Sequence, residues 1–143
     1  MFDFFASKNK KLVNKWHDEH GEIVDLAHKV MAEYAKNNQE GAKKYLKKLN
    51  NLTVDHVMNE DIELFKLVHD DKNLDFETER MVKEFVQGFK KTKLALMEFL
   101  SHYAKPEVPL DEEFFKQFTE IVDAVGDRIQ FEEKNVYSKL KEK

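Results

Sequence analysis

The sequence predicts an all-α protein, an antiparallel up-down-up-down four-helix bundle that forms a single domain over residues 1–143. Apolar residues recur every three or four positions along four long segments. The helix breakers are scarce, with four glycines and two prolines, and they gather between those segments. No alternating strand pattern of useful length interrupts this arrangement. Long amphipathic helices joined by short connections pack as a bundle.

The first helix is expected over about residues 10–36, ending in the stretch AKNNQEG. Its inward positions are Val13, Trp16, Ile23, Ala27, Val30 or Met31, and Tyr34. We expect residues 1–9, which include three phenylalanines, to form an N-terminal arm. Such an arm would cover one end of the bundle or contact a partner protein.

The second helix is expected over about residues 41–68, with Leu49, Leu52, Leu64 and Leu67 on one stripe. The third begins near Asp75, a suitable N-cap, because FETE supplies acids for the first turn. Its inward positions are Met81, Phe85, Phe89, Leu96, Phe99 and Tyr103. KPEVPLDEE ends it, since proline blocks helix continuation and Asp111 can cap the next helix.

The fourth helix carries a near-perfect heptad seam, which is typical of helices packed in a bundle. The seam consists of Phe118, Val122, Val125, Ile129, Val136 and Leu140. Breaks between helices are therefore expected near residues 37–41, 70–75 and 105–111.

Composition excludes several classes of function. The net charge of −4 is spread over mixed signs, which leaves no basic field for nucleic acid or an anionic membrane. Cysteine is absent, so disulfides, thiolate metal sites and cysteine nucleophiles are excluded. No apolar run is long enough to cross a bilayer. We expect a cytoplasmic protein.

Four polar residues interrupt the predicted apolar stripes: His20, His56, Glu60 and Glu132. Folding the hairpins about their loops places His20 opposite residues 55 and 56. The level of Glu60 then falls within one turn of Glu132. Two imidazoles and two carboxylates from three helices are thus expected to converge at one level of the core.

Metal binding explains such a cluster physically. A buried ionised carboxylate costs several kcal/mol unless positive charge compensates it. Mixed imidazole and carboxylate ligation suits iron, manganese or zinc, and the spacing of His56 and Glu60 lets both reach one ion. The alternative is that each residue is separately a hydrogen-bonded core histidine or a glutamate reaching toward water.

The pattern resembles the hemerythrin-like, or HHE cation-binding, domains, which are four-helix bundles holding a non-haem di-iron centre. The resemblance rests on E-H-x-E-I at residues 19–23, H-x-x-x-E at 56–60 and R-I-x-x-E-E-x-x-V-Y at 128–137. It implies that His20, His56, Glu60 and Glu132 match positions that ligate iron in the family.

The sequence departs from the family at two positions. The third helix has no inward histidine, because His102 lies near its end, and Arg128 stands where the fourth helix usually has a histidine. A guanidinium cannot ligate a metal. We expect Arg128 to pair with Glu84 or Glu132, and one metal ion to bind rather than two.

His17 lies one turn from His20, where it either orients that imidazole or is simply a surface residue. Other chemistry has little support, since no nucleophile elbow or phosphate-binding glycine loop is present. An enzyme is therefore not favoured, although an open coordination position on iron would permit one.

Two functions remain. The first is a non-haem metal protein, with iron ahead of zinc or manganese, that binds or senses oxygen, nitric oxide or iron itself. Its partners would be the metal ion and a small diatomic ligand. The second is a metal-free bundle that serves as a protein-interaction or regulatory module.

Overall fold

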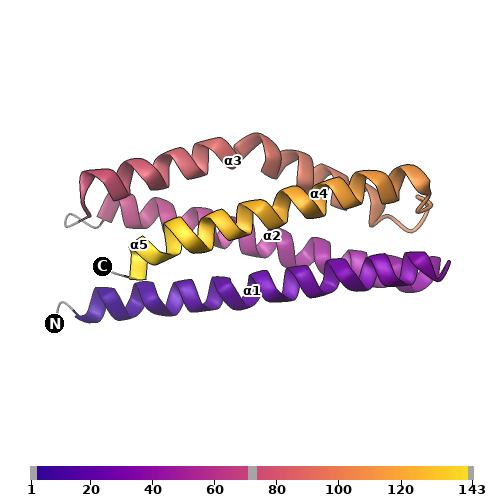
Figure 1. Ribbon diagram of the computed structural model, residues 1–143, viewed down its shortest axis with the longest axis horizontal. Coiled ribbons are helices and arrows are strands. Elements are labelled where there is room, and N and C mark those ends of the chain that lie inside the picture. Colours follow the sequence, from indigo (N-terminus) through magenta and orange to yellow (C-terminus); the bar gives the residue numbers. More distant parts are fainter. Residues whose placement is uncertain (1–2, 71–73, 142–143) are drawn as a thin grey trace.

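The computed structural model describes residues 3–70 and 74–141 and is a bundle of four long helices (Figure 1). The helices are α1 (Asp3–Ala35), α2 (Gln39–Asp70), α3 (Phe76–Tyr103) and α4 (Glu112–Phe131). A π-helical segment η1 (Glu132–Tyr137) and a last turn α5 (Ser138–Lys141) continue α4. The all-α four-helix bundle predicted from the sequence is confirmed. No helix in the described ranges is long and apolar enough to span a membrane.

Polar side chains fix where the helices begin. The Asp75 side chain accepts a hydrogen bond from the Thr78 amide at 2.7 Å. Asp111 Oδ1 accepts one from the Phe114 amide at 2.9 Å. Each bond satisfies an amide that has no partner within the first turn of its helix. Both N-caps expected from the sequence are therefore confirmed.

The α1–α2 turn depends on two asparagines. Asn37 has a φ of 61°, in the left-handed region that asparagine tolerates better than most residues, and α1 ends before it. Asn38 Oδ1 then accepts a hydrogen bond from the Gly41 amide at 3.0 Å at the start of α2. The stretch AKNNQEG thus ends one helix and begins the next, as predicted.

Two helix boundaries differ from the sequence expectation. Helix α1 begins at Asp3, so residues 3–9 continue the helix instead of forming a separate arm; the side chains of Phe2, Phe4 and Phe5 lie outside the described part. The fourth helix is not α-helical throughout, because its backbone changes to π-helix at Glu132.

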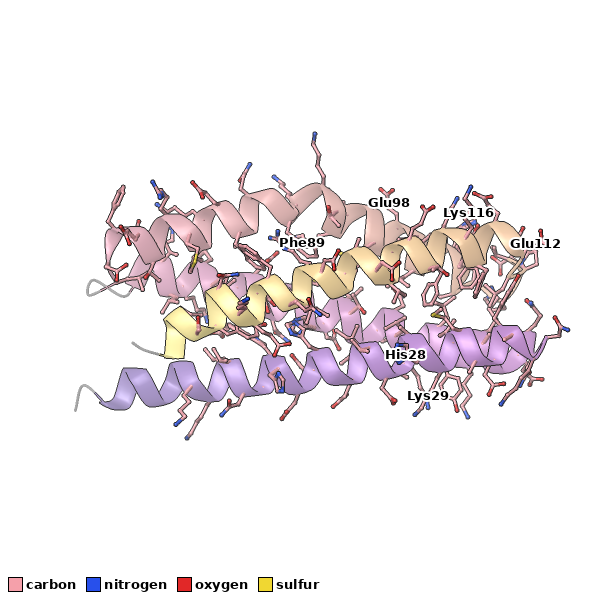
Figure 2. All side chains as sticks on the ribbon, in the orientation of Figure 1. His28, Lys29, Phe89, Glu98, Glu112 and Lys116 are labelled. Atoms are coloured by element: carbon pink, nitrogen blue, oxygen red, sulfur yellow. The ribbon has the colours of Figure 1, made fainter. Side chains whose placement is uncertain are left out.

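The apolar core consists of two clusters. One is built around Val30, Leu46, Leu100, Phe114 and Phe118. The other contains Val13, Trp16, Leu64, Val82, Phe85, Val136, Tyr137 and Leu140. Charged side chains such as Lys29 and Glu98 point outward, whereas Phe89 faces the interior (Figure 2). On α1, His20 lies between Trp16 of the second cluster and Ile23 of the first, so a polar layer separates the two.

Candidate metal centre

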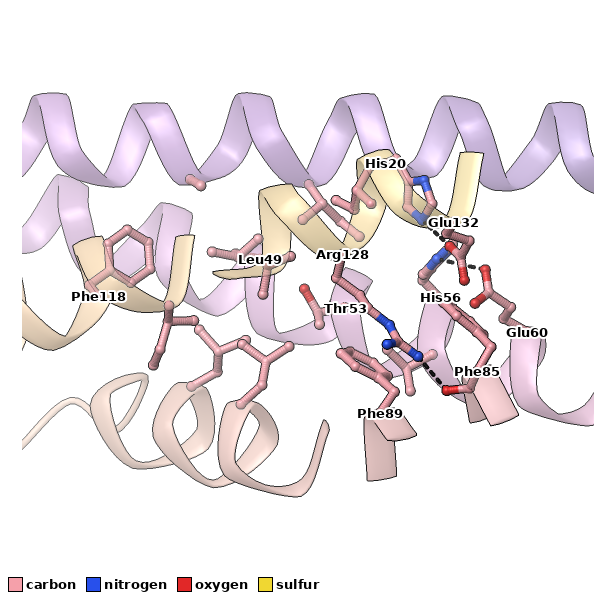
Figure 3. A pocket seen from close by; sticks show the side chains of 18 residues that line it. His20, Leu49, Thr53, His56, Glu60, Phe85, Phe89, Phe118, Arg128 and Glu132 are labelled. Atoms are coloured by element: carbon pink, nitrogen blue, oxygen red, sulfur yellow. Dashed lines mark hydrogen bonds and ion pairs between the residues drawn. The ribbon is translucent and has the colours of Figure 1, made fainter. Parts of the chain in front are cut away.

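The structure brings His20, His56, Glu60 and Glu132 together in this polar layer (Figure 3). One ligand atom from each lies within 4.8 Å of the others, and every residue is less than one-tenth exposed. Helix α1 supplies His20, α2 supplies His56 and Glu60 one turn apart, and Glu132 is the first residue of η1. The convergence predicted from hairpin folding is therefore present.

Both imidazoles turn the same nitrogen inward. His20 Nε2 lies 3.0 Å from Glu132 Oε1, and His56 Nε2 lies 3.3 Å from Glu60 Oε2. The rings contact edge to face, with centroids 4.6 Å apart. The two Nε2 atoms and the two carboxylates thus face one another around a common point.

The outward nitrogens contact a second pair of carboxylates. His56 Nδ1 lies 2.8 Å from Glu19 Oε1, and His20 Nδ1 lies 3.3 Å from Glu133 Oε2. When Nδ1–H donates to these carboxylates, the Nε2 lone pair is free to bind a cation. Metal-binding histidines in proteins usually have this arrangement, because the carboxylate fixes the tautomer and orients the ring.

Tyr137 completes the cluster from η1. Its hydroxyl lies 2.6 Å from Glu60 Oε2 and 2.7 Å from Glu132 Oε1, and its ring stacks on that of His20 with centroids 5.6 Å apart. In the sequence Tyr137 ends the motif R-I-x-x-E-E-x-x-V-Y, which predicts no role for its hydroxyl. A heptad seam gives no signal for it, because residues five apart point about 140° away from each other on an α-helix.

The pKa values of the two glutamates depend on their burial and on each other. Burial and the neighbouring Glu60 raise the pKa of Glu132. Burial would also raise the pKa of Glu60, but hydrogen bonding with Glu132 and His56 lowers it. Without a cation, the carboxylate pair therefore retains a proton on Glu132.

The pKa values of the two histidines shift in opposite directions. Burial and the nearby His56 lower the pKa of His20. Burial opposes protonation of His56 as well, but hydrogen bonds and charges from Glu60 and Glu19 outweigh it and raise the pKa. In the metal-free protein, His56 is therefore the imidazole that takes up a proton first.

The donor set fits a metal ion. Two neutral imidazole nitrogens and two carboxylate oxygens are ligands that iron, manganese and zinc accept. A divalent cation would replace the proton on Glu132 and that on His56 and would neutralise both carboxylates. His20, His56, Glu60 and Glu132 as the ligand set stay a prediction.

The residues around the cluster differ from expectation in one respect. Glu84 does not hold Arg128, because its side chain is 74% exposed and pairs with Arg80 on the same face of α3. The Arg128 guanidinium instead donates to the carbonyl of Phe85 and lies over the Phe85 ring, with Cζ 3.8 Å from the centroid. Arg128 forms no ion pair with a carboxylate among the described residues, although Glu132 and Glu60 act on its charge and oppose the lowering of its pKa by burial.

His17 contacts the cluster only indirectly. Its side chain is 65% exposed, and Nδ1 binds Glu133, whose other oxygen faces His20. Glu133 thus links a surface imidazole to a buried one. His17 is thus a surface residue, and a role in orienting His20 through Glu133 stays a prediction.

A bundle with a buried cluster of two histidines and two glutamates belongs to the class of helical cation-binding proteins. The chain belongs to the hemerythrin HHE cation-binding domain family, whose model matches residues 11–140. Comparison with curated proteins and with solved structures gives no match.

Proposed function

We propose that this protein binds one non-haem metal ion, iron ahead of zinc or manganese, in the cluster between α1, α2 and η1. One observation carries the proposal: both buried imidazoles present Nε2 to the carboxylates and Nδ1 to a second carboxylate. Two independent histidines of an ordinary core have no reason to share this arrangement. His20 and His56 would ligate through Nε2, and Glu60 and Glu132 through their carboxylates.

The role that fits this site is binding or sensing of oxygen, nitric oxide or iron itself. A bound ferrous ion would supply an affinity for small diatomic ligands that protein side chains lack. The polypeptide would contribute a water-poor site, fixed imidazole tautomers and the Tyr137 hydroxyl beside the carboxylates. Arg128 favours one ion over two, because like charges repel strongly in a poorly solvated core.

Metal content and thermal stability test this proposal together. Protein purified without a nickel column should contain about one metal ion per chain, and chelation should lower its Tm by several degrees, since a ligand that binds only the folded state stabilises it. Glu60→Gln should abolish the difference between loaded and chelated protein. Glu63→Gln, a change on the same helix at a residue paired with Lys66 near the surface, should retain it.

A second function, a metal-free interaction module, is favoured by one feature of α2. Met58, Ile62 and Phe65 lie on one face of the helix, and Phe65 is 64% exposed. If the protein contains no metal and chelation leaves the Tm unchanged, this function replaces the first.

A further inference from the structure

A cavity of about 70 Å³ is lined at one end by the cluster and continues along the bundle axis (Figure 3). Its walls are mostly apolar, from Ile23, Leu49, Leu100, Phe118 and Val125. Two polar side chains outside the His/Glu cluster also line it, Thr53 and Arg128. The cavity is thus an apolar space with a few polar groups at the end nearest the cluster.

Thr53 and Arg128 lie at the same level of the bundle. Thr53 precedes His56 by three residues on α2, and Arg128 precedes Glu132 by four on α4. Helices α2 and α4 run in the same direction in an up-down-up-down bundle, so both residues lie about 4.5–6 Å further along the bundle axis than His56 and Glu132, on the same side. They form the next layer of the core.

Both residues carry a polar atom without a partner. Among the described residues, Thr53 Oγ1 and Arg128 Nε are buried and accept or donate no hydrogen bond. Thr53 is 4% exposed. A helical threonine usually satisfies itself by donating to a preceding carbonyl, as Thr119 does to Phe115 at 2.8 Å. Thr53 does not, which leaves its hydroxyl available to a group in the cavity.

The guanidinium is fixed in place. Its Nη2 donates to the Phe85 carbonyl, and the group lies against the rings of Phe85 and Phe89 (Figure 3). This contact holds the guanidinium on α3 through Nη2, while the neighbouring Nε–H has no acceptor. A held cation with an unused donor lines the cavity.

We propose that this cavity binds one small monovalent oxyanion, of the size of formate or nitrite, through Arg128 and Thr53. An anion supplies acceptors to an N–H and an O–H and places negative charge beside the guanidinium. Water would find two polar partners here as well, but it would leave the charge of Arg128, which forms no ion pair with a carboxylate among the described residues, uncompensated. The volume limits the ligand to about three heavy atoms, since an apolar cavity of about 150 Å³ holds benzene.

The proposed anion site uses other side chains than the proposed metal site, although His20, His56, Glu60 and Glu132 line the same cavity. The Arg128 guanidinium has no lone pair with which to ligate a cation, so binding of an anion to it is tested independently of metal affinity. Arg128 occupies the position where the family resemblance leads one to expect a ligand of a second metal. The bundle would therefore hold an anion next to one cation, in place of a second cation.

Formate is the probe for the test, on both zinc-loaded and chelator-treated protein. The Tm is measured with sodium formate at 100 mM and with sodium methanesulfonate, which is too large for the cavity, at the same ionic strength. We expect formate to raise the Tm by about 3 °C relative to methanesulfonate in at least one preparation. Thr53→Val should remove most of this shift, and Arg128→Met should remove all of it.

Two matched variants serve as controls. Thr119→Val removes a hydroxyl that is already satisfied within α4, and Arg80→Met removes an exposed guanidinium. Both should keep the formate shift. No shift in either preparation, or a shift that survives Thr53→Val and Arg128→Met, would overturn the anion site and show that water fills the cavity. The metal content of the same samples reports separately on the proposed metal site.

Discussion

The Tyr137 hydroxyl contacts both glutamates of the buried cluster. This hydroxyl has a single proton and lies within hydrogen-bond distance of two buried carboxylates. Burial and the charges of Glu132 and Glu60 raise its pKa, so the phenol stays protonated and acts as a donor. In the absence of metal the phenol donates to the Glu60–Glu132 pair, which retains one proton on Glu132.

Tyr137→Phe should therefore destabilise the metal-free protein more than the metal-loaded protein. Removing the donor leaves buried carboxylate oxygens unsatisfied, which costs about 1–3 kcal/mol, whereas a bound cation satisfies the same oxygens. Chemical denaturation of both forms measures the difference, and Tyr45→Phe, at a partly buried tyrosine of α2, is the control. Equal destabilisation of both forms would show that the hydroxyl serves packing alone.

The sequence predicts the four residues that face one another in the candidate site, but not the two glutamates that contact the outward nitrogens of the histidines. His20, His56, Glu60 and Glu132 interrupt apolar stripes, which makes them visible by periodicity alone. Glu19 and Glu133 are not visible in this way, because they lie beside the stripes at positions where a solvated glutamate is normal. Their contact with the outward imidazole nitrogens depends on side-chain directions across helices, which spacing does not encode.

At the scale of the elements, η1 is the departure that shapes the site. A π-helical turn widens the helix, so Glu132, Val136 and Tyr137 are all buried on one face. Such segments are rare and occur often at functional sites. The heptad pattern of the fourth helix predicted its core face correctly. It contains no signal for the extra residue in the π-helical turn, because Val136 already fits the spacing expected of an α-helix.

The helix ends were predictable for a local reason. Asp75 and Asp111 cap helices through contacts three residues away, and chemistry at that distance is encoded in the sequence. Contacts between loops far apart in the sequence cannot be predicted in this way. Gln39 reaches Leu110 from the opposite hairpin, donating to its carbonyl at 2.8 Å and accepting from its amide at 3.0 Å.

Gln39→Ala should lower the free energy of unfolding by about 1–3 kcal/mol, because the amide and carbonyl of buried Leu110 lose both partners. The metal content should not change, since this contact lies at the loop end of the bundle. Urea denaturation provides the measurement. Gln117→Ala, which breaks an exposed bond to Glu113, should cost under about 0.5 kcal/mol. A similar cost for both would mean that Gln39 does not tie the two loops together.

At the scale of the whole molecule, the bundle places a polar layer between two apolar clusters. The clusters supply most of the burial that stabilises the fold. The layer between them stabilises little by itself, because buried charges lose hydration. We therefore expect the bundle to stay folded without the metal. Binding of the metal should then appear as an increase in stability.

Acidity should control that response. Metal ligands must be deprotonated, and in the metal-free protein the raised pKa values of His56 and Glu132 mean that both retain protons to higher pH than usual. The pKa of His20 is lowered, so this residue competes with the metal only at lower pH. Metal affinity should therefore rise with pH, because each proton that the metal displaces is easier to remove at higher pH.

Below about pH 6.5, where His56 keeps its proton because its pKa is raised above the ordinary histidine value, the affinity for zinc should increase about tenfold per pH unit for each proton displaced. Competition with a chromophoric chelator measures it, with circular dichroism checking that the bundle stays folded at each pH. His28→Asn, which alters an exposed histidine of α1, should leave the slope unchanged. Because both groups hold protons to higher pH than usual, an affinity that is flat over this range would mean that the metal displaces neither proton and binds elsewhere.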